Sequence, residues 1–136
     1  MQATLIIALV LHVLSGVFWA GSTFALARTG GNQADRFFRP QMGAATVAIV
    51  TGGVLGYLVH RGTPGIQEHL LGIGALCALL AAGVQGSGAR AVRELSASSS
   101  GAGGAFAANS RVATSQRIAA ALLAVTVICM AAARYA

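Results

Sequence analysis

The sequence predicts an all-helical integral membrane protein, a single-domain bundle of four transmembrane helices over residues 1–136. Hydrophobic residues make up 56% of the chain and charged residues only 9%, and the mean hydropathy is +0.74. Soluble domains carry about a quarter charged residues, so this composition excludes a cytosolic globular protein. The apolar residues gather in four runs, each near the roughly 20 residues that a helix needs to cross a bilayer. The runs do not alternate with period two, and open strands cannot satisfy their backbone in lipid.

The four predicted spans follow one another along the chain. The first, residues 3–27, contains no charged residue and lacks the positively charged start of a cleavable signal peptide. The second, residues 42–59, begins just after Pro40, a residue that suits the first turn of a helix. The third covers residues 70–89, and the fourth covers residues 115–133.

The connections between the spans determine the predicted orientation. A basic loop covers residues 28–41, and a tight turn with Gly and Pro covers residues 60–69. A Ser-, Gly- and Ala-rich stretch, residues 94–112, is predicted to be a flexible linker. Seven of the nine arginines adjoin the first and third connections: Arg28, Arg36, Arg39, Arg90, Arg93, Arg111 and Arg117. The positive-inside rule therefore places these two connections in the cytoplasm and both termini outside.

Charge and cysteine content exclude several other classes of protein. The net charge of +6 comes from nine basic and three acidic residues, too few to form an interleaved nucleic-acid-binding face. No Asp or Glu lies within a span, so the carboxylate relay typical of ion-coupled transporters is missing from the sequence. Cys77 and Cys129 both lie in apolar runs, which argues against a disulfide framework and against reactive thiols. The expected partner is the lipid bilayer, with no nucleic acid.

Small and polar residues within the spans predict how the helices pack. Gly52 and Gly56 lie four positions apart on the second span, and Gly72 and Gly83 lie on the third. Helices in lipid associate by close backbone approach, so these glycines are expected at helix contacts. Gln85, a polar side chain inside the third span, is expected to form an interhelical hydrogen bond.

His12 is the clearest candidate for a functional residue, because a polar side chain inside a span is costly. Gly16, Trp19 and Thr23 share its helix face at spacings of four, three and four, so Trp19 is a further candidate cofactor contact. An imidazole in this position needs either a hydrogen bond across helices or a metal, and neutral imidazole is a common ligand of haem iron. The sequence leaves both alternatives open.

Further residues are candidates to complete a cofactor or metal site. Met130 on the fourth span lies at a similar depth to His12, which favours a His–Met axial pair on a haem. His60 and His69 flank the turn between the second and third spans, about 13 Å or more from the span centres. They are alternative axial ligands or a separate metal site. Arg28, at the inner end of the first span, is a candidate to bind a haem propionate or a lipid phosphate, or is only a topological anchor.

One pattern on the first span is typical of a known family. The pattern His-x6-Trp-x-Gly-x6-Arg is formed by His12, Trp19, Gly21 and Arg28. With residues 35–40 and 79–95, it resembles a superfamily of small four-helix membrane proteins that includes bacterial membrane-bound protoporphyrinogen oxidase and copper-resistance D-type proteins. The resemblance implies haem ligation by His12. Gln85 stands where the oxidase members carry a histidine, so porphyrin-oxidising activity is not implied.

The sequence thus predicts a b-type haem protein of the bacterial inner membrane, with His12 and Met130, or alternatively His60 or His69, as axial ligands. It would pass electrons between a membrane reductant or porphyrinogen and a quinone or partner subunit. One alternative is a copper-handling membrane protein that binds copper through His60 and His69, with Met130 and the two cysteines as further candidate ligands. Another is a cofactor-free accessory subunit of a larger membrane complex. A homo-oligomer or a place in such a complex is expected.

Overall fold

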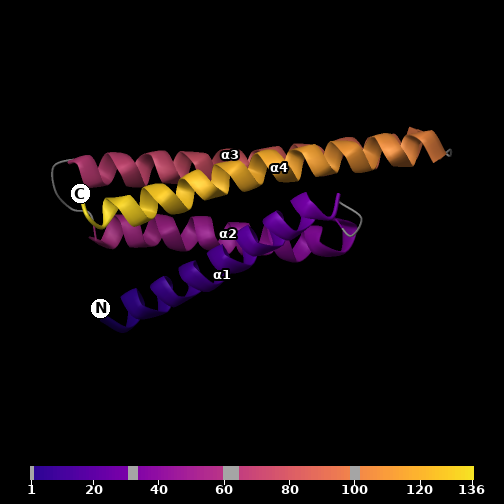
Figure 1. Ribbon diagram of the computed structural model, residues 1–136. Coiled ribbons are helices and arrows are strands. Elements are labelled where there is room, and N and C mark those ends of the chain that lie inside the picture. The colour runs from indigo at the N-terminus through magenta and orange to yellow at the C-terminus, as the bar shows by residue number, and fades with distance from the viewer. Residues whose placement is uncertain (1, 31–33, 60–64, 99–101) are drawn as a thin grey trace.

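The computed structural model describes residues 2–30, 34–59, 65–98 and 102–136 as four long helices (Figure 1). They are, in chain order, α1 (Gln2–Arg28), α2 (Ala34–Val59), α3 (Ile66–Ser98) and α4 (Ala102–Ala133). The residues described contain no β-strand. The prediction of an all-helical chain with four long helices is confirmed.

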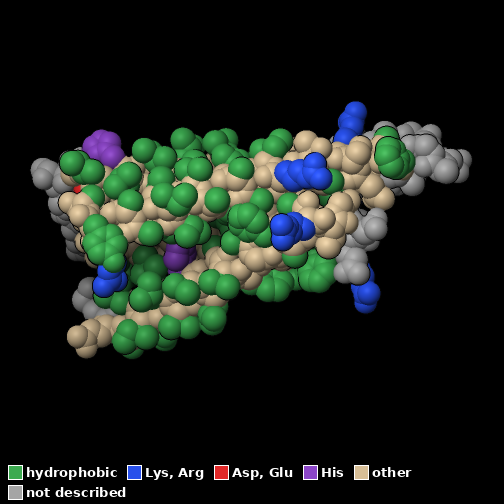
Figure 2. All heavy atoms as spheres, in the orientation of Figure 1, with side chains coloured by type: hydrophobic (Ala, Val, Ile, Leu, Met, Phe, Trp, Pro, Cys, Tyr) green, Lys and Arg blue, Asp and Glu red, His purple; other side chains and the backbone are tan. Residues whose placement is uncertain are grey.

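Each helix contains a segment long and apolar enough to cross a membrane. These segments are Gln2–Arg28, Arg36–Val59, Ile66–Arg90 and Asn109–Ala133. Large apolar side chains cover much of the visible surface in Figure 2. Ile7, Leu14 and Val17 on α1, for example, are each at least 60% exposed. A soluble protein rarely presents so much contiguous apolar surface, so the chain is suited to contact with lipid as a multi-pass membrane protein.

Alanine dominates the contacts between the helices. The buried core cluster consists of Trp19, Ala45, Ala48, Ala78, Ala81, Ala119 and Leu123. Because an alanine side chain is a single methyl group, these positions let the helix backbones approach closely and gain dispersion contacts. Helices α3 and α4 pack against each other most extensively, and α1 packs mainly on α2. Figure 1 shows α1 crossing the bundle obliquely, with its N-terminal end apart from the other helices.

The flexible linker predicted for residues 94–112 is helical wherever the structure describes it, and residues 99–101 lie outside the described residues. Helix α3 continues to Ser98 and α4 begins at Ala102, so both parts of the stretch are helical. Alanine has the highest helix propensity, and extending an existing helix avoids the cost of nucleation. This favours continuing the two helices beyond their membrane-spanning segments. They project as a helical hairpin beyond α1 and α2 (Figure 1).

Helix α2 also begins earlier than the sequence predicted. Pro40 was expected in the first turn, but α2 begins at Ala34 and Pro40 lies inside it. Proline inside a helix loses one backbone hydrogen bond to the carbonyl four residues earlier, here that of Arg36. The position is still within the first two turns, so the rest of the helix is left intact.

Only one of the four glycines expected at helix contacts lies at a close contact. A Cβ added at Gly52 would lie 2.9 Å from His12 Cε1, whereas one added at Gly56, Gly72 or Gly83 would meet nothing within 4 Å. Small-residue packing is therefore confirmed at Gly52 and wrong at the other three positions. A helix face with glycines allows close packing, but the buried contacts between these helices are formed mostly by alanines.

A close approach between α3 and α4 makes Gly88 sensitive to substitution. A Cβ there would lie 2.7 Å from Ser115 Oγ and 3.0 Å from Ser115 Cβ. We expect Gly88→Ala to lower the free energy of unfolding by about 1–3 kcal/mol through overpacking. The matched variant Gly86→Ala, whose Cβ would meet nothing within 4 Å, should be neutral or gain up to about 1 kcal/mol of helix propensity. Denaturant unfolding in detergent measures both, and equal effects would contradict this contact.

Candidate functional site

His12 makes its hydrogen bonds to helix α2. Its ring nitrogen Nδ1 lies 2.8 Å from the backbone oxygen of Ala48 and 3.3 Å from Thr51 Oγ1. The Thr51 hydroxyl donates to the Val47 carbonyl at 2.6 Å, so its oxygen is free to accept from the imidazole. The interhelical hydrogen bond that the sequence left open for His12 is therefore present.

These contacts determine the tautomer of the neutral His12 ring. A backbone carbonyl oxygen can only accept, so Nδ1 carries the hydrogen that points to Ala48. The other ring nitrogen, Nε2, then bears a lone pair. Within the part of the chain that the structure describes, no hydrogen bond to Nε2 is found. The half-buried ring thus has one anchored nitrogen and one nitrogen available as a ligand or an acceptor.

Gly52 provides the space that the His12 ring occupies. The position of a Cβ on Gly52 is 2.9 Å from Cε1, closer than real Cβ atoms approach, and 3.3 Å from Nδ1, a tight contact. Any residue other than glycine would push the ring away from α2 and lengthen its bond to Ala48. The orientation of the His12 ring is therefore set by its bond to the Ala48 carbonyl and by the space that Gly52 leaves beside it.

His12 lies where α1 begins to leave the bundle. Three of the four buried residues of α1, Trp19, Thr23 and Leu26, follow His12 in the chain, and only Ala8 precedes it. Figure 2 shows a recess between the N-terminal half of α1 and the helices beside it, with a histidine side chain at its edge. The side of His12 toward the N-terminus of α1 is therefore the more open one.

Met130 packs at the contact between α3 and α4. Its Cγ lies 3.8 Å from the position of a Cβ on Gly74, and Cys129 Cβ lies 3.4 Å from the same point. Cys77 and Cys129 are free cysteines of intermediate burial. Met130 as a haem ligand stays a prediction.

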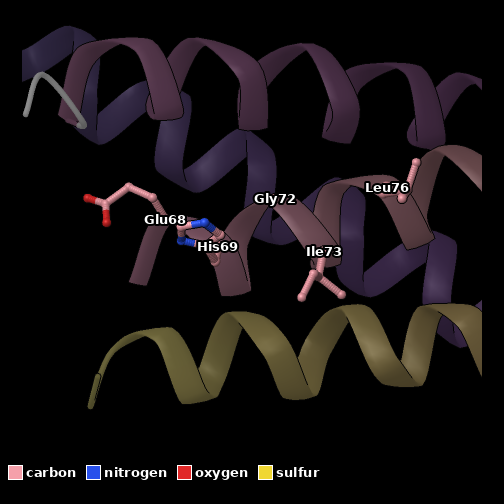
Figure 3. Close-up of a pocket in the computed structure, with 5 residues that line it drawn as sticks. All are labelled: Glu68, His69, Gly72, Ile73 and Leu76. Atoms are coloured by element: carbon pink, nitrogen blue, oxygen red, sulfur yellow. The ribbon is translucent and has the colours of Figure 1, made fainter. Parts of the chain in front are cut away.

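His69 lies on the exposed start of α3, next to Glu68 (Figure 3). Its Nδ1 is 2.7 Å from the Gly65 carbonyl oxygen, and Glu68 Oε2 accepts from the Gly65 backbone N–H at 2.7 Å. These bonds cap the helix start. Glu68 and His69 line an open groove of about 350 Å³ on α3 together with Gly72, Ile73 and Leu76. Their local role is therefore to begin α3.

The predicted metal site between His60 and His69 falls partly outside the described residues, because His60 is not among them. Among those described, no three His, Cys, Asp or Glu side chains form a group that could hold a metal ion. Arg28 is exposed at the end of α1, and no described residue forms an ion pair with it.

The described residues also form a buried polar cluster that links all four helices. We call it the polar clasp. Its members are Trp19 and Thr23 of α1, Gln41 of α2, Gln85 of α3 and Gln116 of α4. Each exposes 4% or less of its surface. The interhelical hydrogen bond predicted for Gln85 is confirmed.

The hydrogen bonds of the polar clasp form a closed ring. The Gln85 amide nitrogen donates to Thr23 Oγ1 at 2.9 Å and to Gln116 Oε1 at 3.0 Å. The Gln41 amide nitrogen donates to the same two oxygens at 2.8 and 3.4 Å, and Gln116 Nε2 donates back to Gln41 Oε1 at 3.4 Å. Trp19 Nε1 donates to Gln85 Oε1 at 2.8 Å. Nearly every polar atom of the three amides therefore has a partner, as burial requires.

The polar clasp is a structural device. None of its five side chains ionises near neutral pH, so it does not hold or transfer a proton. The indole N–H of Trp19, predicted as a cofactor contact, is bonded to Gln85 in the core. Sequence reasoning missed Gln41 and Gln116, since both were placed at span ends, where glutamine is ordinary. The signal available was that Gln41, Gln85 and Gln116 each lie five positions from an arginine next to a basic connection.

Replacing one member of the polar clasp tests its contribution. Gln85→Leu removes three interhelical hydrogen bonds, each worth about 0.6 kcal/mol in membrane proteins, so the free energy of unfolding should fall by about 2 kcal/mol. Emission from Trp19, the one tryptophan in the sequence, should shift to shorter wavelength as its N–H loses a polar partner. Gln67→Leu, an exposed position on the same helix, is the matched control and should change neither. An unchanged Trp19 spectrum in Gln85→Leu would refute the assignment.

Comparisons with known proteins do not add a family to this picture. No protein-family model, no curated protein and no solved structure matches the chain. The resemblance to the four-helix superfamily stays a prediction. What the chain can do chemically is therefore inferred from the contacts of His12 and of the polar clasp.

Proposed function

We propose that this chain is a haem-binding membrane protein in which His12 is an axial ligand of a b-type haem. The observation that carries the proposal is a half-buried imidazole whose Nδ1–H is bonded to the Ala48 carbonyl and whose Nε2 has no hydrogen bond to any residue that the structure describes. Histidines that bind metals typically donate their other ring N–H to a carbonyl or carboxylate, which fixes the tautomer and the ring orientation. Burying a polar ring inside a membrane span costs free energy, so its presence there points to a function.

The donor chemistry at His12 fits a haem better than a metal cage built from side chains alone. A haem iron takes four of its ligands from the porphyrin, so the chain needs to contribute only one or two axial residues. His12 would be one of them. Met130, His60 and His69 stay the predicted candidates for the second, and Trp19 would act through the core rather than by touching the cofactor.

A haem bound at His12 would supply one-electron redox chemistry. The residues of this chain would control it in two ways. By accepting from Nδ1–H, the Ala48 carbonyl would hold the imidazole in place and make it a stronger donor to a bound iron. The apolar helices around His12 would limit the access of water to the cofactor. A membrane reductant or porphyrinogen as electron donor, and a quinone or partner subunit as acceptor, complete the proposal.

Absorption spectra of the purified full chain test this function. The wild type, supplied with haem, should show a Soret band and reduced α-band, and His12→Ala should lose them. Imidazole added to His12→Ala should restore a Soret band, because it can replace the missing ring. Gln67→Leu, at an exposed position of α3 outside the proposed site, is the control and should bind haem normally.

The outcomes separate the competing functions. Haem bands that survive in His12→Ala would overturn ligation by His12. Copper without porphyrin in the preparation would favour a copper-handling protein, and a colourless, metal-free protein that co-purifies with a larger complex would favour an accessory subunit. Gly52→Ala should shift or weaken the Soret band by displacing the ring, whereas Gly56→Ala should not.

We further propose that the chain lies in the bacterial inner membrane with both termini outside. Seven of its nine arginines adjoin the connections from α1 to α2 and from α3 to α4, which the positive-inside rule places in the cytoplasm. Blue side chains gather toward that end of the bundle in Figure 2.

Cysteine labelling in intact cells tests the orientation. In a chain with Cys77 and Cys129 replaced by Ala, a cysteine at Ala136 should react with a membrane-impermeant maleimide from outside. A cysteine at Ser110, exposed on α4 near the arginines, should react only after lysis. The reverse pattern would contradict the proposed topology.

A further inference from the structure

Four arginines stand in the same relation to the polar clasp, one on each helix. Arg28 follows Thr23 by five positions on α1, and Arg90 follows Gln85 by five on α3. On the helices that run the other way, Arg36 precedes Gln41 and Arg111 precedes Gln116, again by five positions. We call these four residues the arginine belt.

The polar clasp places the arginine belt at a single level of the bundle. Its hydrogen bonds hold Thr23, Gln41, Gln85 and Gln116 side by side. A helix rises 1.5 Å per residue, so five positions put each arginine about 7.5 Å beyond the clasp on the same side. The four Cα atoms therefore lie near one plane across the bundle.

The belt arginines point outward rather than into the bundle. At 3.6 residues per turn, five positions turn a side chain about 140° away from the direction of its clasp residue, which is inward. All four arginines are exposed, in agreement with this geometry. No hydrogen bond or ion pair of their guanidinium groups is found among the residues that the structure describes. The belt is a ring of cationic groups, one on each side of the molecule.

The opposite end of the bundle provides an independent check on the level of the belt. Tyr57 on α2 lies 21 positions from Arg36, and His69 on α3 lies 21 positions from Arg90. Both separations correspond to about 31 Å along a helix, close to the roughly 30 Å of a bilayer hydrocarbon core. Tyr57 is 73% exposed, as is typical of tyrosines at a membrane interface. The belt therefore falls at the headgroup level when Tyr57 falls at the other interface.

We propose that the arginine belt binds the phosphates of anionic phospholipids in one leaflet and thereby fixes the depth of the bundle. Guanidinium groups form paired hydrogen bonds with phosphate oxygens, and the long side chain reaches the headgroups from the helix surface. Anionic lipids are favoured over zwitterionic ones because the sequence places seven arginines and only two acidic residues, Asp35 and Glu94, at this end. The interaction does not depend on haem.

Thermal unfolding of the full chain in a non-ionic detergent tests the proposal. At 50 mM NaCl, dioleoylphosphatidylglycerol should stabilise the wild type at a concentration at least tenfold lower than dioleoylphosphatidylcholine. One arginine near an anionic surface contributes about fivefold in affinity. Arg36→Gln with Arg111→Gln should therefore weaken the phosphatidylglycerol effect at least fivefold. Arg61→Gln with Arg134→Gln removes the same charge from the sequence between α2 and α3 and from the sequence after α4, and should leave the effect within twofold.

Three results would overturn the proposal. Equal stabilisation of the wild type by the two lipids would show that anionic headgroups are not selected, and equal losses in the two double variants would show that only net charge matters. A phosphatidylglycerol effect that persists unchanged in 0.5 M NaCl would show that it is not electrostatic. The wild-type measurements decide the question even if the Arg36 and Arg111 variant fails to fold. Inorganic phosphate at the same concentration should not stabilise the chain, which separates a lipid site from a free-phosphate site.

Discussion

The structure depends on a ring of amide hydrogen bonds buried where water cannot replace them. Apolar helices gain little from meeting one another in lipid, because the acyl chains are as apolar as the side chains that they would replace. Alanine contacts allow close approach but do not by themselves select which helix faces which. The polar clasp selects which helices face each other, because each of its glutamines bonds to partners on other helices. Any other arrangement would leave an amide unpaired in hydrocarbon, which costs free energy. It therefore sets both the partners and the register of the four helices.

The two halves of the bundle differ because the polar clasp lies in only one of them. Toward the arginines, α1 is held by Trp19 and Thr23, and its buried residues concentrate there. Toward its N-terminus, α1 leaves the other helices (Figure 1), and His12 is its last strong polar contact before it does so. His12 therefore lies between the half of α1 that is held by the polar clasp and the half that leaves the bundle. Gly52 and the Ala48 carbonyl provide that accuracy, and they act on the ring without occupying Nε2.

Sequence reasoning was accurate for features that depend on one residue and its solvent. Four apolar helices, a buried bond at Gln85 and an interhelical contact at His12 all follow from the cost of polar groups in lipid. It was less accurate where the outcome depends on a second helix. The depth of Met130 along its helix could not show that its side chain packs at the contact with Gly74, because depth does not give the direction of a side chain. The 94–112 stretch was expected to be flexible from its composition, although its alanines also extend helices that already exist.

Composition and hydropathy alone determined that this chain is helical and suited to a bilayer, because backbone groups in hydrocarbon must be satisfied within each segment. They also identified His12 as a candidate functional residue and gave the distribution of arginines that predicts the orientation. Only the tertiary structure decided that Gln41 and Gln116 belong with Gln85, that Trp19 serves the core, and that four arginines share a plane. These relations join residues that lie far apart in the chain. They depend on the rotation of one helix relative to another, which hydropathy does not encode.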